Sequence, residues 1–552
     1  MCTLCDQGKP QDHSRKPQSS QLGRRDFLKA STATAAAAAG ASLFAANRAR
    51  AHDDDDGPQD SGRRGRRYVI RGGSVMTMDP SMPNKGEWPK ADVLIEGKKI
   101  LAVGPNLHVW GAGEIDARGK IVMPGFVDTH HHQAWTAIRS SIPDSILIDD
   151  KSGTPSAAQN YFGNILLGFA PRYRPEDVYI SELFGGLAQL DNGVTTVHDV
   201  SQIHHSPEHS DAAIKALFDT GRRAAFGFFE SAGASVLGTN PGNQYPQDAT
   251  RIKTRWFSSS DQLVHMIMGG EVYLGDPSTV ASWTLGRQLG LQVAAHILSP
   301  FGIRSILDRL TNGTFPGGIQ VGPDNLFIHM TGMSDPAWAK VKDVGAQVSI
   351  AFPIEMNMRH GMPPIHKMQE LGIEPSLSTD VETNLTADFF TQMRSAMTMQ
   401  RMVVNQDILN TGDFTTFVGG VAPGSAWPPP PAPPAPGSLP LLNVRDVLRY
   451  ATINGAKHLR LDGKTGSLTP GKEADIIILD AEHINVFPVN HVPGAVVQMM
   501  ERSNVETVIV AGKVRKWQGR LLDVDQRRLR NRLEDSRDFI YAAAGVTQNL
   551  FR

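Results

Sequence analysis

Six side chains that can bind a metal ion or move a proton stand directly after short apolar runs of the chain: His130, His131, His132, His296, His329 and Asp380. Imidazole nitrogens and a carboxylate are ligands that suit Zn²⁺ or Fe²⁺ where no thiolate is available. A site of this kind lowers the pKa of a bound water to about 7, so that hydroxide forms at neutral pH. The residue types therefore predict a site that activates water on a divalent metal ion.

The spacing of these residues matches a repeat of one strand and one helix. His296 and His329 lie about one such unit apart, and His329 and Asp380 about two. Alternate residues of a strand face the same side, so His130 and His132 can point to one metal ion while His131 points elsewhere. Four strands that each end in a metal-capable side chain are improbable by chance, which favours one shared site.

Eight apolar runs alternate with helical stretches after Gly119, which predicts an α/β fold, a (β/α)8 TIM barrel. The candidate metal residues follow the first, fifth, sixth and eighth runs, at the carboxyl ends where barrel enzymes place catalytic groups. A doubly wound open sheet is the alternative, but no G-x-G-x-x-G follows the first run. The predicted strands are 121–128, 193–199, 223–229, 271–274, 291–297, 325–330, 347–352 and 375–379.

Both ends of the chain contain short β-rich runs separated by turn residues, which predicts a small β-sandwich domain formed by both chain ends. Its first part is 67–122 and its second part, after a helix, lies within 446–525. The barrel is expected at 123–445 with a Pro-rich insertion at 422–440, and a helical tail at 526–552.

The first 51 residues have the three regions of an export signal. Arg24 and Arg25 precede an Ala-rich stretch, 30–46, and Ala49-Arg50-Ala51 forms a small-x-small cleavage site. We therefore expect a twin-arginine signal peptide at 1–51, the Tat translocase as a partner during export, and a periplasmic or secreted mature protein. The Asp-rich segment 52–66 is expected to be a disordered linker.

The charge balance excludes two classes of protein. The chain has 55 Lys+Arg and 56 Asp+Glu, and the leader holds eight of the former against three of the latter, so the remainder is acidic. An acidic body does not predict binding to nucleic acid, and no apolar run after the leader could span a membrane. The two cysteines, Cys2 and Cys5, lie in the leader, so the mature chain offers no thiol ligands. The oligomeric state stays open, a homo-oligomer included.

The motif Pro124-Gly125-Phe126-Val127-Asp128-Thr129-His130-His131-His132, with His296, His329 and Asp380, resembles the amidohydrolase superfamily, in particular its cytosine-deaminase-like and triazine-hydrolase-like branch. The segments 451–457 and 466–475 are similar to that family's return from the barrel to the β-domain.

The resemblance implies one divalent metal ion, zinc with iron as the alternative, held by His130, His132, His296 and Asp380. It also implies that Asp380 takes a proton from water and that His329 polarises the substrate. Relatives with two metal ions carry a carboxylated lysine after the fourth strand. Neither 223–231 nor 271–275 contains a lysine, which favours one ion.

One position departs from the family pattern. Deaminases of this branch commonly carry a glutamate three residues after the fifth-strand histidine, and Ser299 stands there in this chain. A hydroxyl cannot replace a carboxylic acid as proton donor. Glu355, after the seventh strand, is the candidate substitute and the third predicted catalytic residue beside Asp380 and His329. A solvated or ion-paired surface glutamate is the alternative interpretation.

A second group of histidines follows the second strand: His198, His204 and His205. Contact with the substrate is one interpretation of this loop. Exposed loop histidines are the other.

We expect a metal-dependent hydrolase that acts on non-peptide C–N bonds of a small cyclic or heteroaromatic substrate by metal-activated water. Ser299 favours amide-type hydrolysis. The alternative is an aminohydrolase (deaminase) or chlorohydrolase of a pyrimidine, purine or triazine. From another class, the alternative is an exported metal- or ligand-binding protein without turnover, against which the intact Asp380 argues.

Overall fold

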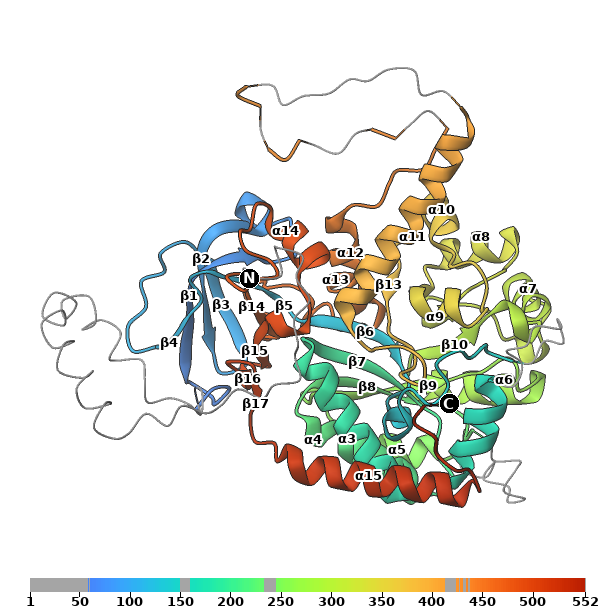
Figure 1. Ribbon diagram of the computed structural model, residues 1–552. Coiled ribbons are helices and arrows are strands. Elements are labelled where there is room, and N and C mark those ends of the chain that lie inside the picture. Colours follow the sequence, from blue (N-terminus) through green and yellow to red (C-terminus); the bar gives the residue numbers. More distant parts are fainter. Residues whose placement is uncertain are drawn as a thin grey trace, which may run out of the picture. The chain divides into compact units, whose positions relative to one another are not determined.

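The computed structural model describes residues 58, 60–148, 159–232, 245–412, 423–425, 427–429, 433–434 and 437–551 (Figure 1). The predicted signal peptide lies outside the described residues, as do parts of the predicted linker and of the Pro-rich insertion. The linker residues 60–66 form turns, and the buried Ser61 hydroxyl accepts a hydrogen bond from Val514 N at 3.0 Å. No helix within the described part of the chain is long and apolar enough to cross a membrane.

Eight parallel strands form the central sheet, which confirms the predicted barrel. The first and last strands meet through two backbone hydrogen bonds, from His132 N to Asp380 O at 2.8 Å and from Asp380 N to His130 O at 2.9 Å. The strands pair in chain order and are β6 (Phe126–His131), β7 (Val194–Ser201), β8 (Arg223–Phe228), β9 (Val264–Gly269), β10 (Val293–Ile297), β11 (Asn325–His329), β12 (Gln347–Ile350) and β13 (Ser376–Leu377).

Two of the predicted barrel strands are corrected. The fourth strand is β9, and 271–274 lies in the loop after it. His265 interrupts the apolar pattern of β9, which hid the strand, although the side chain of this histidine is largely buried. The predicted first strand, 121–128, is two strands, because Lys120–Pro124 forms β5 of the other sheet and β6 begins at Phe126. Gly125 separates them, and a Cβ at Gly125 would lie 2.2 Å from the side chain of Thr195.

Helices connect the barrel strands and cover their outer face (Figure 1). The helix expected before the second part of the β-domain is two short helices, α12 and α13, because Thr452 leaves the helical conformation at φ −132° and ψ −90°. The helices are α3 (Pro175–Asp191), α4 (Pro207–Thr220), α5 (Ala249–Trp256), α6 (Asp276–Gln288), α7 (Arg304–Asn312), α8 (Asp335–Val344), α9 (Phe352–Asn357), α10 (Ile365–Leu371), α11 (Phe389–Asn410), α12 (Val444–Tyr450), α13 (Ile453–His458), α14 (Val492–Gly494) and α15 (Gln526–Ala543).

The second sheet contains strands from both chain ends, as the sequence predicts. Its centre is the antiparallel pair β5 and β14. Alternation along β14 divides the side chains between two cores: Ile477 and Leu479 pack with the barrel, and Ile476 and Ile478 pack inside the β-domain. The strands are β1 (Arg67–Met76), β2 (Glu87–Glu96), β3 (Lys99–Gly104), β4 (Gly113–Asp116), β5, β14 (Ile476–Asp480), β15 (Val505–Val510), β16 (Lys513–Trp517) and β17 (Arg520–Leu521).

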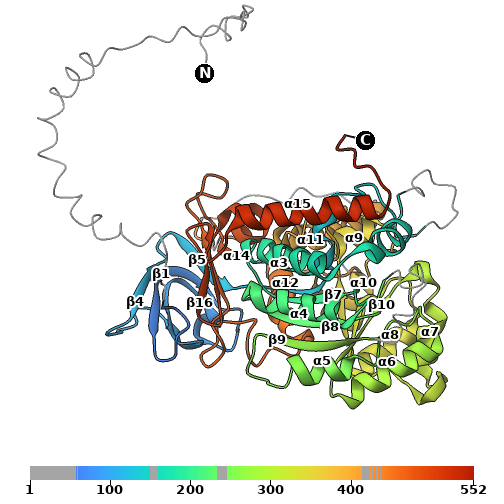
Figure 2. The same ribbon diagram turned by 90° about the horizontal axis from the view of Figure 1, so that it is seen from below.

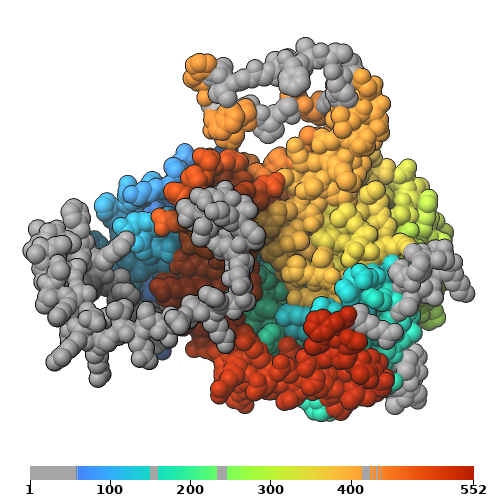
Figure 3. Space-filling model, viewed as in Figure 1, coloured from blue at the N-terminus to red at the C-terminus, as the bar shows by residue number. Residues whose placement is uncertain are grey.

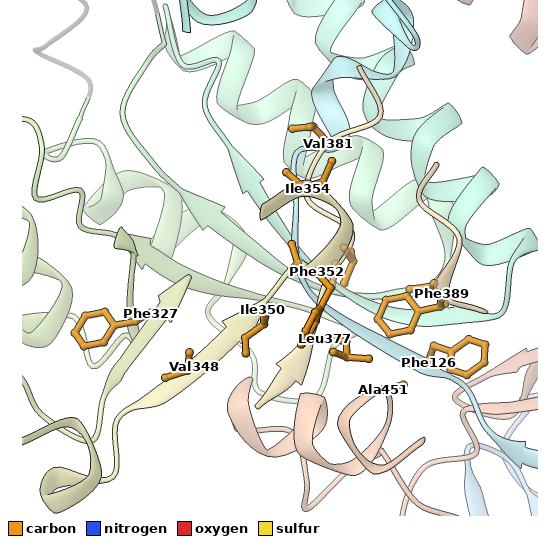
Figure 4. Packing of buried hydrophobic residues seen from close by; sticks show 14 of the residues in the cluster. Phe126, Phe327, Val348, Ile350, Phe352, Ile354, Leu377, Val381, Phe389 and Ala451 are labelled. Carbon is orange, nitrogen blue, oxygen red and sulfur yellow. The ribbon is translucent and has the colours of Figure 1, made fainter. Parts of the chain in front are cut away.

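Aromatic packing fixes the start of the strand that bears two of the candidate metal residues. The ring of Phe126 stacks on Phe389 of α11 with centroids 5.4 Å apart (Figure 4). It also meets Phe390 edge-on at 5.2 Å. All three rings are fully buried. Such pairs add roughly 0.5–1.5 kcal/mol to the contribution of the buried area, so this contact holds β6 firmly against α11.

The C-terminal helix α15 packs along α3 (Figure 2) and forms part of the surface in Figure 3. The Arg174 guanidinium lies 3.6 Å from the ring centroid of Phe539, and the Ser536 hydroxyl donates to Asp177. Cation–π contacts and a buried hydrogen bond of this kind attach the helix to the barrel.

A buried ion pair joins the barrel to the β-domain. Arg223, the first residue of β8, donates to Asp475 at 2.8 Å and to Glu473 at 2.7 Å. Arg223 is 1% exposed, and Asp475 also accepts from Ala511 N at 2.7 Å. Removal of one partner would leave uncompensated buried charge.

We therefore predict that Arg223→Ala lowers the free energy of unfolding by about 3–5 kcal/mol. Arg255→Ala is the matched control, because the Arg255 side chain is 59% exposed in its ion pair with Asp211 and should cost under about 1 kcal/mol. Denaturant unfolding followed by Trp fluorescence measures both. Equal effects of the two substitutions would contradict the anchoring role of Arg223.

Candidate functional site

The barrel brings the predicted residues together at the carboxyl ends of its strands. Ligand-capable atoms of His130, His132 and His296 lie within 4.8 Å of one another, as do those of His130, His329 and Asp380. Asp380 Oδ1 lies 3.0 Å from His130 Nε2 and 3.7 Å from His132 Nε2, and Asp380 Oδ2 lies 3.6 Å from His329 Nε2. All of these side chains are at most one-tenth exposed. The residues that the sequence places at the ends of strands therefore form one cluster.

Two residues of this cluster, one at the end of β11 and one just after β13, have unusual backbones. His329 has a φ of 74° and Asp380 a φ of 62°, in the left-handed region that non-glycine residues rarely adopt. Such conformations cost on the order of 1–3 kcal/mol and concentrate at functional sites. The surrounding barrel therefore holds both side chains in the cluster against a local preference.

Three of the histidines are fixed by a hydrogen-bond partner at Nδ1, which leaves Nε2 toward the cluster. His132 Nδ1 donates to Val200 O at 3.1 Å and His296 Nδ1 donates to Glu271, while His329 Nδ1 shares a hydrogen bond of 2.9 Å with Glu355 Oε1. A carbonyl or carboxylate behind a histidine sets its tautomer and ring orientation in metal sites.

The geometry fits a divalent metal ion. Burial holds the pKa of His130 and His132 well below the usual range for histidine, so both are neutral at neutral pH and able to bind a metal ion. Burial alone would raise the pKa of Asp380, but His329 and the other histidines around it lower the pKa, which keeps the carboxylate ionised. The buried Nδ1 of His130 has no hydrogen-bond partner within the described residues. Neutral imidazoles around one carboxylate form a donor set for zinc or iron.

Glu271 is a site residue that the sequence reasoning missed. It lies just after β9, is fully buried, and also accepts from His296 N at 3.1 Å. The misplaced fourth strand concealed it, because 271–274 was assigned to the strand itself. A buried carboxylate two residues after a correctly placed β9 would have indicated it.

Glu355 lies behind His329 and does not line the cavity. It is fully buried in α9, and its Oε1 also accepts from Ala351 N at 3.0 Å. The surface interpretation of Glu355 is therefore wrong. Burial raises its pKa well above the usual value for glutamate.

A cavity of roughly 430 Å³, its open mouth included, lies over the cluster. Asp380 is the carboxylate among its lining residues, and Ser299 is exposed and does not line it. Besides His132, His296, His329 and Asp380, the lining residues are Leu147, Tyr161, Leu166, Gln202, Tyr273, Leu298, Phe301, Met358, His360 and Val381.

The second group of histidines has a structural arrangement. His204 is buried, and its Nε2 donates to Ser201 O at 2.8 Å while Ser210 Oγ lies 2.9 Å from Nδ1. His205 is partly buried, and it contacts Ala170 O at 2.9 Å and Ser231 Oγ at 2.6 Å in the same way. Neither of these two histidines lines the cavity, although Gln202 of the same loop does, and neither is fully exposed. Both interpretations are therefore wrong for His204 and His205. His198 donates to Thr129 O at 3.0 Å, also outside the cavity lining.

Comparison with known proteins agrees with this geometry. The family model "Amidohydrolase family" matches residues 121–416 and 440–515. The chain belongs to the amidohydrolase family. Its predicted class, a metal-dependent hydrolase acting on non-peptide C–N bonds, is confirmed at that level.

Two curated amidohydrolase relatives are deaminases. The 5'-deoxyadenosine deaminase of Methanosarcina mazei is 28% identical over 484 residues, which cover 84% of this chain and 95% of the relative. The 5-methylthioadenosine/S-adenosylhomocysteine deaminase of Symbiobacterium thermophilum is 24% identical over 468 residues, 81% of this chain and 93% of the relative.

Two solved structures share the amidohydrolase fold. An adenosine deaminase from Xanthomonas campestris with bound zinc has a TM-score of 0.66 at 19% identity and covers 86% of this chain and 98% of its own. A triazine hydrolase from Arthrobacter aurescens has a TM-score of 0.68 at 19% identity, with 86% and 99% covered. At this identity the likeness shows the fold.

We predict that Glu271→Gln in this amidohydrolase weakens binding of a divalent metal ion about 10- to 100-fold, because His296 loses the carboxylate that fixes its tautomer. Competition with a chelator, followed by elemental analysis, measures the affinity. The matched control is Glu534→Gln, an exposed glutamate on α15. Unchanged metal affinity in the Glu271 variant would contradict this role.

A second prediction concerns acid stability. Burial lowers the pKa of His204 to about 3 and that of His205 to about 4. Below the usual histidine pKa of about 6.5 the unfolded chain binds protons that the folded protein does not. The free energy of unfolding should therefore fall as the pH drops from about 6.5 toward 4, by roughly 1 kcal/mol per pH unit for each such group.

The contribution of one group is isolated by His205→Gln, with the exposed His483→Gln as control. Urea unfolding between pH 7.5 and 5 should show a shallower loss of stability in the His205 variant and the wild-type slope in the control. A wild-type slope in both would refute the assignment.

Proposed function

We propose that this amidohydrolase uses one divalent ion, zinc, to hydrolyse a C–N bond of a small cyclic substrate whose reacting carbon is already electrophilic, as in a cyclic amide or imide. The observation that favours this class is the absence of a second carboxylate among the described cavity-lining residues, with Ser299 exposed beside the cavity. Amino-substituted aromatic rings need a ring nitrogen protonated before attack, and a serine cannot supply that proton.

His130, His132, His296 and Asp380 would hold the ion. When bound, a zinc ion acidifies water and polarises the carbonyl under attack. Asp380 Oδ2, on the side of His329, is the base that accepts the proton of water and passes it to the leaving nitrogen. The apolar side chains Leu147, Leu166 and Leu298 exclude bulk water from this transfer.

His329 and Glu355 are proposed to share one proton. If the proton is on Glu355, the carboxylic acid donates to Nδ1, and the neutral imidazole has its hydrogen on Nε2. If the proton moves to His329, both ring nitrogens carry hydrogen. In either arrangement Nε2 donates a hydrogen bond toward the oxyanion that develops on the substrate. The raised pKa of Glu355 favours retention of this proton.

Glu355 is therefore a positioning residue that acts through His329. We predict that Glu355→Gln lowers kcat by about 10² with metal content unchanged, the usual size of general acid–base effects. The alkaline limb of the kcat profile should also move, which loss of packing alone would not cause. Near-wild-type turnover, or lower metal content with an unchanged pH profile, would refute the role. Glu534→Gln serves as the control.

The reaction class is tested with metal-analysed protein and a panel of cyclic amides, cyclic imides, aminopyrimidines, aminopurines and triazines. Ring opening without ammonia release supports the proposal. Ammonia release from the amino-substituted rings supports deamination, the second candidate, which the names of the curated relatives favour. Tight metal binding without turnover of any panel compound supports the exported binding protein instead.

We propose export through the twin-arginine signal at 1–51. The double substitution Arg24→Lys and Arg25→Lys should leave the uncleaved chain in the cytoplasm. N-terminal sequencing of the exported protein should read from His52. Export of the double variant at the wild-type level would overturn this proposal.

A further inference from the structure

Part of the cavity wall is polar without belonging to the metal cluster. Gln202 and Tyr273 line the cavity, and both bind the same carboxylate, that of Glu230. Gln202 Nε2 donates to Glu230 Oε1 at 2.9 Å, and the Tyr273 hydroxyl donates to the same oxygen. Glu230 follows β8 by two residues, so it lies at the same end of the barrel as the metal cluster.

These two hydrogen bonds fix which way the lining groups can interact with a bound molecule. A tyrosine hydroxyl has one hydrogen, and Glu230 takes it, so the Tyr273 oxygen can only accept from the cavity. The Gln202 amide turns its nitrogen to Glu230, which leaves its carbonyl oxygen as a second acceptor. Glu230 thereby makes this wall complementary to hydrogen-bond donors.

The orientation of this wall is the same whether Glu230 is ionised or protonated. Its Oε2 is buried and has no hydrogen-bond partner among the described residues. Burial and the nearby Glu271 raise the pKa of Glu230 to about 7. A proton taken up at this free oxygen leaves Oε1 as the acceptor of both bonds, so the orientation of the wall does not depend on the charge state.

Aromatic rings adjoin this wall. The ring centroids of Tyr273 and Phe301 are 5.1 Å apart, and those of Phe301 and Phe162 are 6.0 Å apart. Flat ligands pack well against such surfaces. A planar ring that carries N–H groups meets both the aromatic and the accepting part of the wall.

We propose that Glu230 is a positioning residue which makes Gln202 and Tyr273 a pair of acceptors for the N–H groups of a planar ring substrate. The proposal names the substrate class of the proposed function. It rests on that function, because it takes the cavity over the metal cluster as the substrate site. Rings with free N–H groups away from the reacting carbon are bound, and rings with those nitrogens alkylated are rejected.

The test measures equilibrium binding of matched ring pairs, uracil with 1,3-dimethyluracil and melamine with hexamethylmelamine, to the zinc-loaded mature protein by calorimetry. Wild type should bind the N–H member at least about tenfold more tightly, because a hydrogen-bonding site rejects an analogue that lacks the donor. Glu230→Leu, which removes the acceptor of both bonds, should reduce this ratio to near one by weakening the N–H member alone. Glu230→Gln is the matched control, because its amide oxygen can replace Oε1, and it should keep the wild-type ratio. Tyr273→Phe should lower it partially.

For any panel substrate that is turned over, Glu230→Leu should raise KM about tenfold with little change in kcat, and Glu534→Gln should behave as wild type. Equal binding, or no binding, of both pair members by wild type overturns the proposal. So does a Glu230→Leu variant that keeps the wild-type ratio or that weakens both members equally.

Because binding is measured without turnover, the two proposals fail separately. A protein that discriminates the pairs but hydrolyses nothing contradicts the proposed function alone. A protein that hydrolyses ring substrates without discriminating the pairs contradicts the acceptor wall alone.

Discussion

The closure of the barrel between its first and last strands is the constraint on which the site depends. The two hydrogen bonds between Asp380 and the backbone of His130 and His132 are at once the last link of the sheet and the link that sets the Asp380 carboxylate beside the histidines of β6. The closure places Asp380 at a positive φ, a conformation that the isolated residue would avoid. The cost is met by the packed strands on both sides, so the position of the carboxylate depends on the whole barrel rather than on local preference.

Groups that form hydrogen bonds to the far side of three histidines fix the orientation of their rings. Three imidazoles could turn about their side-chain bonds, but Val200 O, Glu271 and Glu355 each hold one Nδ1. These three groups are of two kinds, one carbonyl and two carboxyl groups. A carbonyl fixes orientation only, whereas a buried carboxylate also determines how readily the imidazole gives or keeps a proton. The ring of His132 is thus fixed in orientation only, as suits a metal ligand, while His329, with a protonatable carboxyl behind it, is suited to donate toward a substrate.

The two histidines of the loop after β7, His204 and His205, have a structural role. Each ring nitrogen of His204 and His205 contacts a backbone carbonyl or a serine hydroxyl, so these rings have no lone pair left for a metal ion or a substrate. Through Ala170, His205 ties the segment that contains Tyr161 and Leu166, two lining residues, to the loop after β7. The number of histidines in a loop therefore says little about function until the partners of both nitrogens are known.

These contrasts explain how far the sequence could predict the structure. Residues that follow apolar runs at regular spacing, such as His296 and Asp380, were predictable because parallel strands end on one side of a barrel. Glu271 was not, since the polar His265 disguised β9 and moved the apparent strand onto the loop. Glu355 was visible as a residue but not as a partner of His329, because a hydrogen bond from the end of β11 to α9 has no signature along the chain. Glu230 belongs to no motif for the same reason: its role depends on hydrogen bonds with Gln202 and Tyr273, which come from two other loops. The strand pattern thus predicts which groups reach the mouth of the barrel, and only the folded loops determine the protonation and direction of the groups around them.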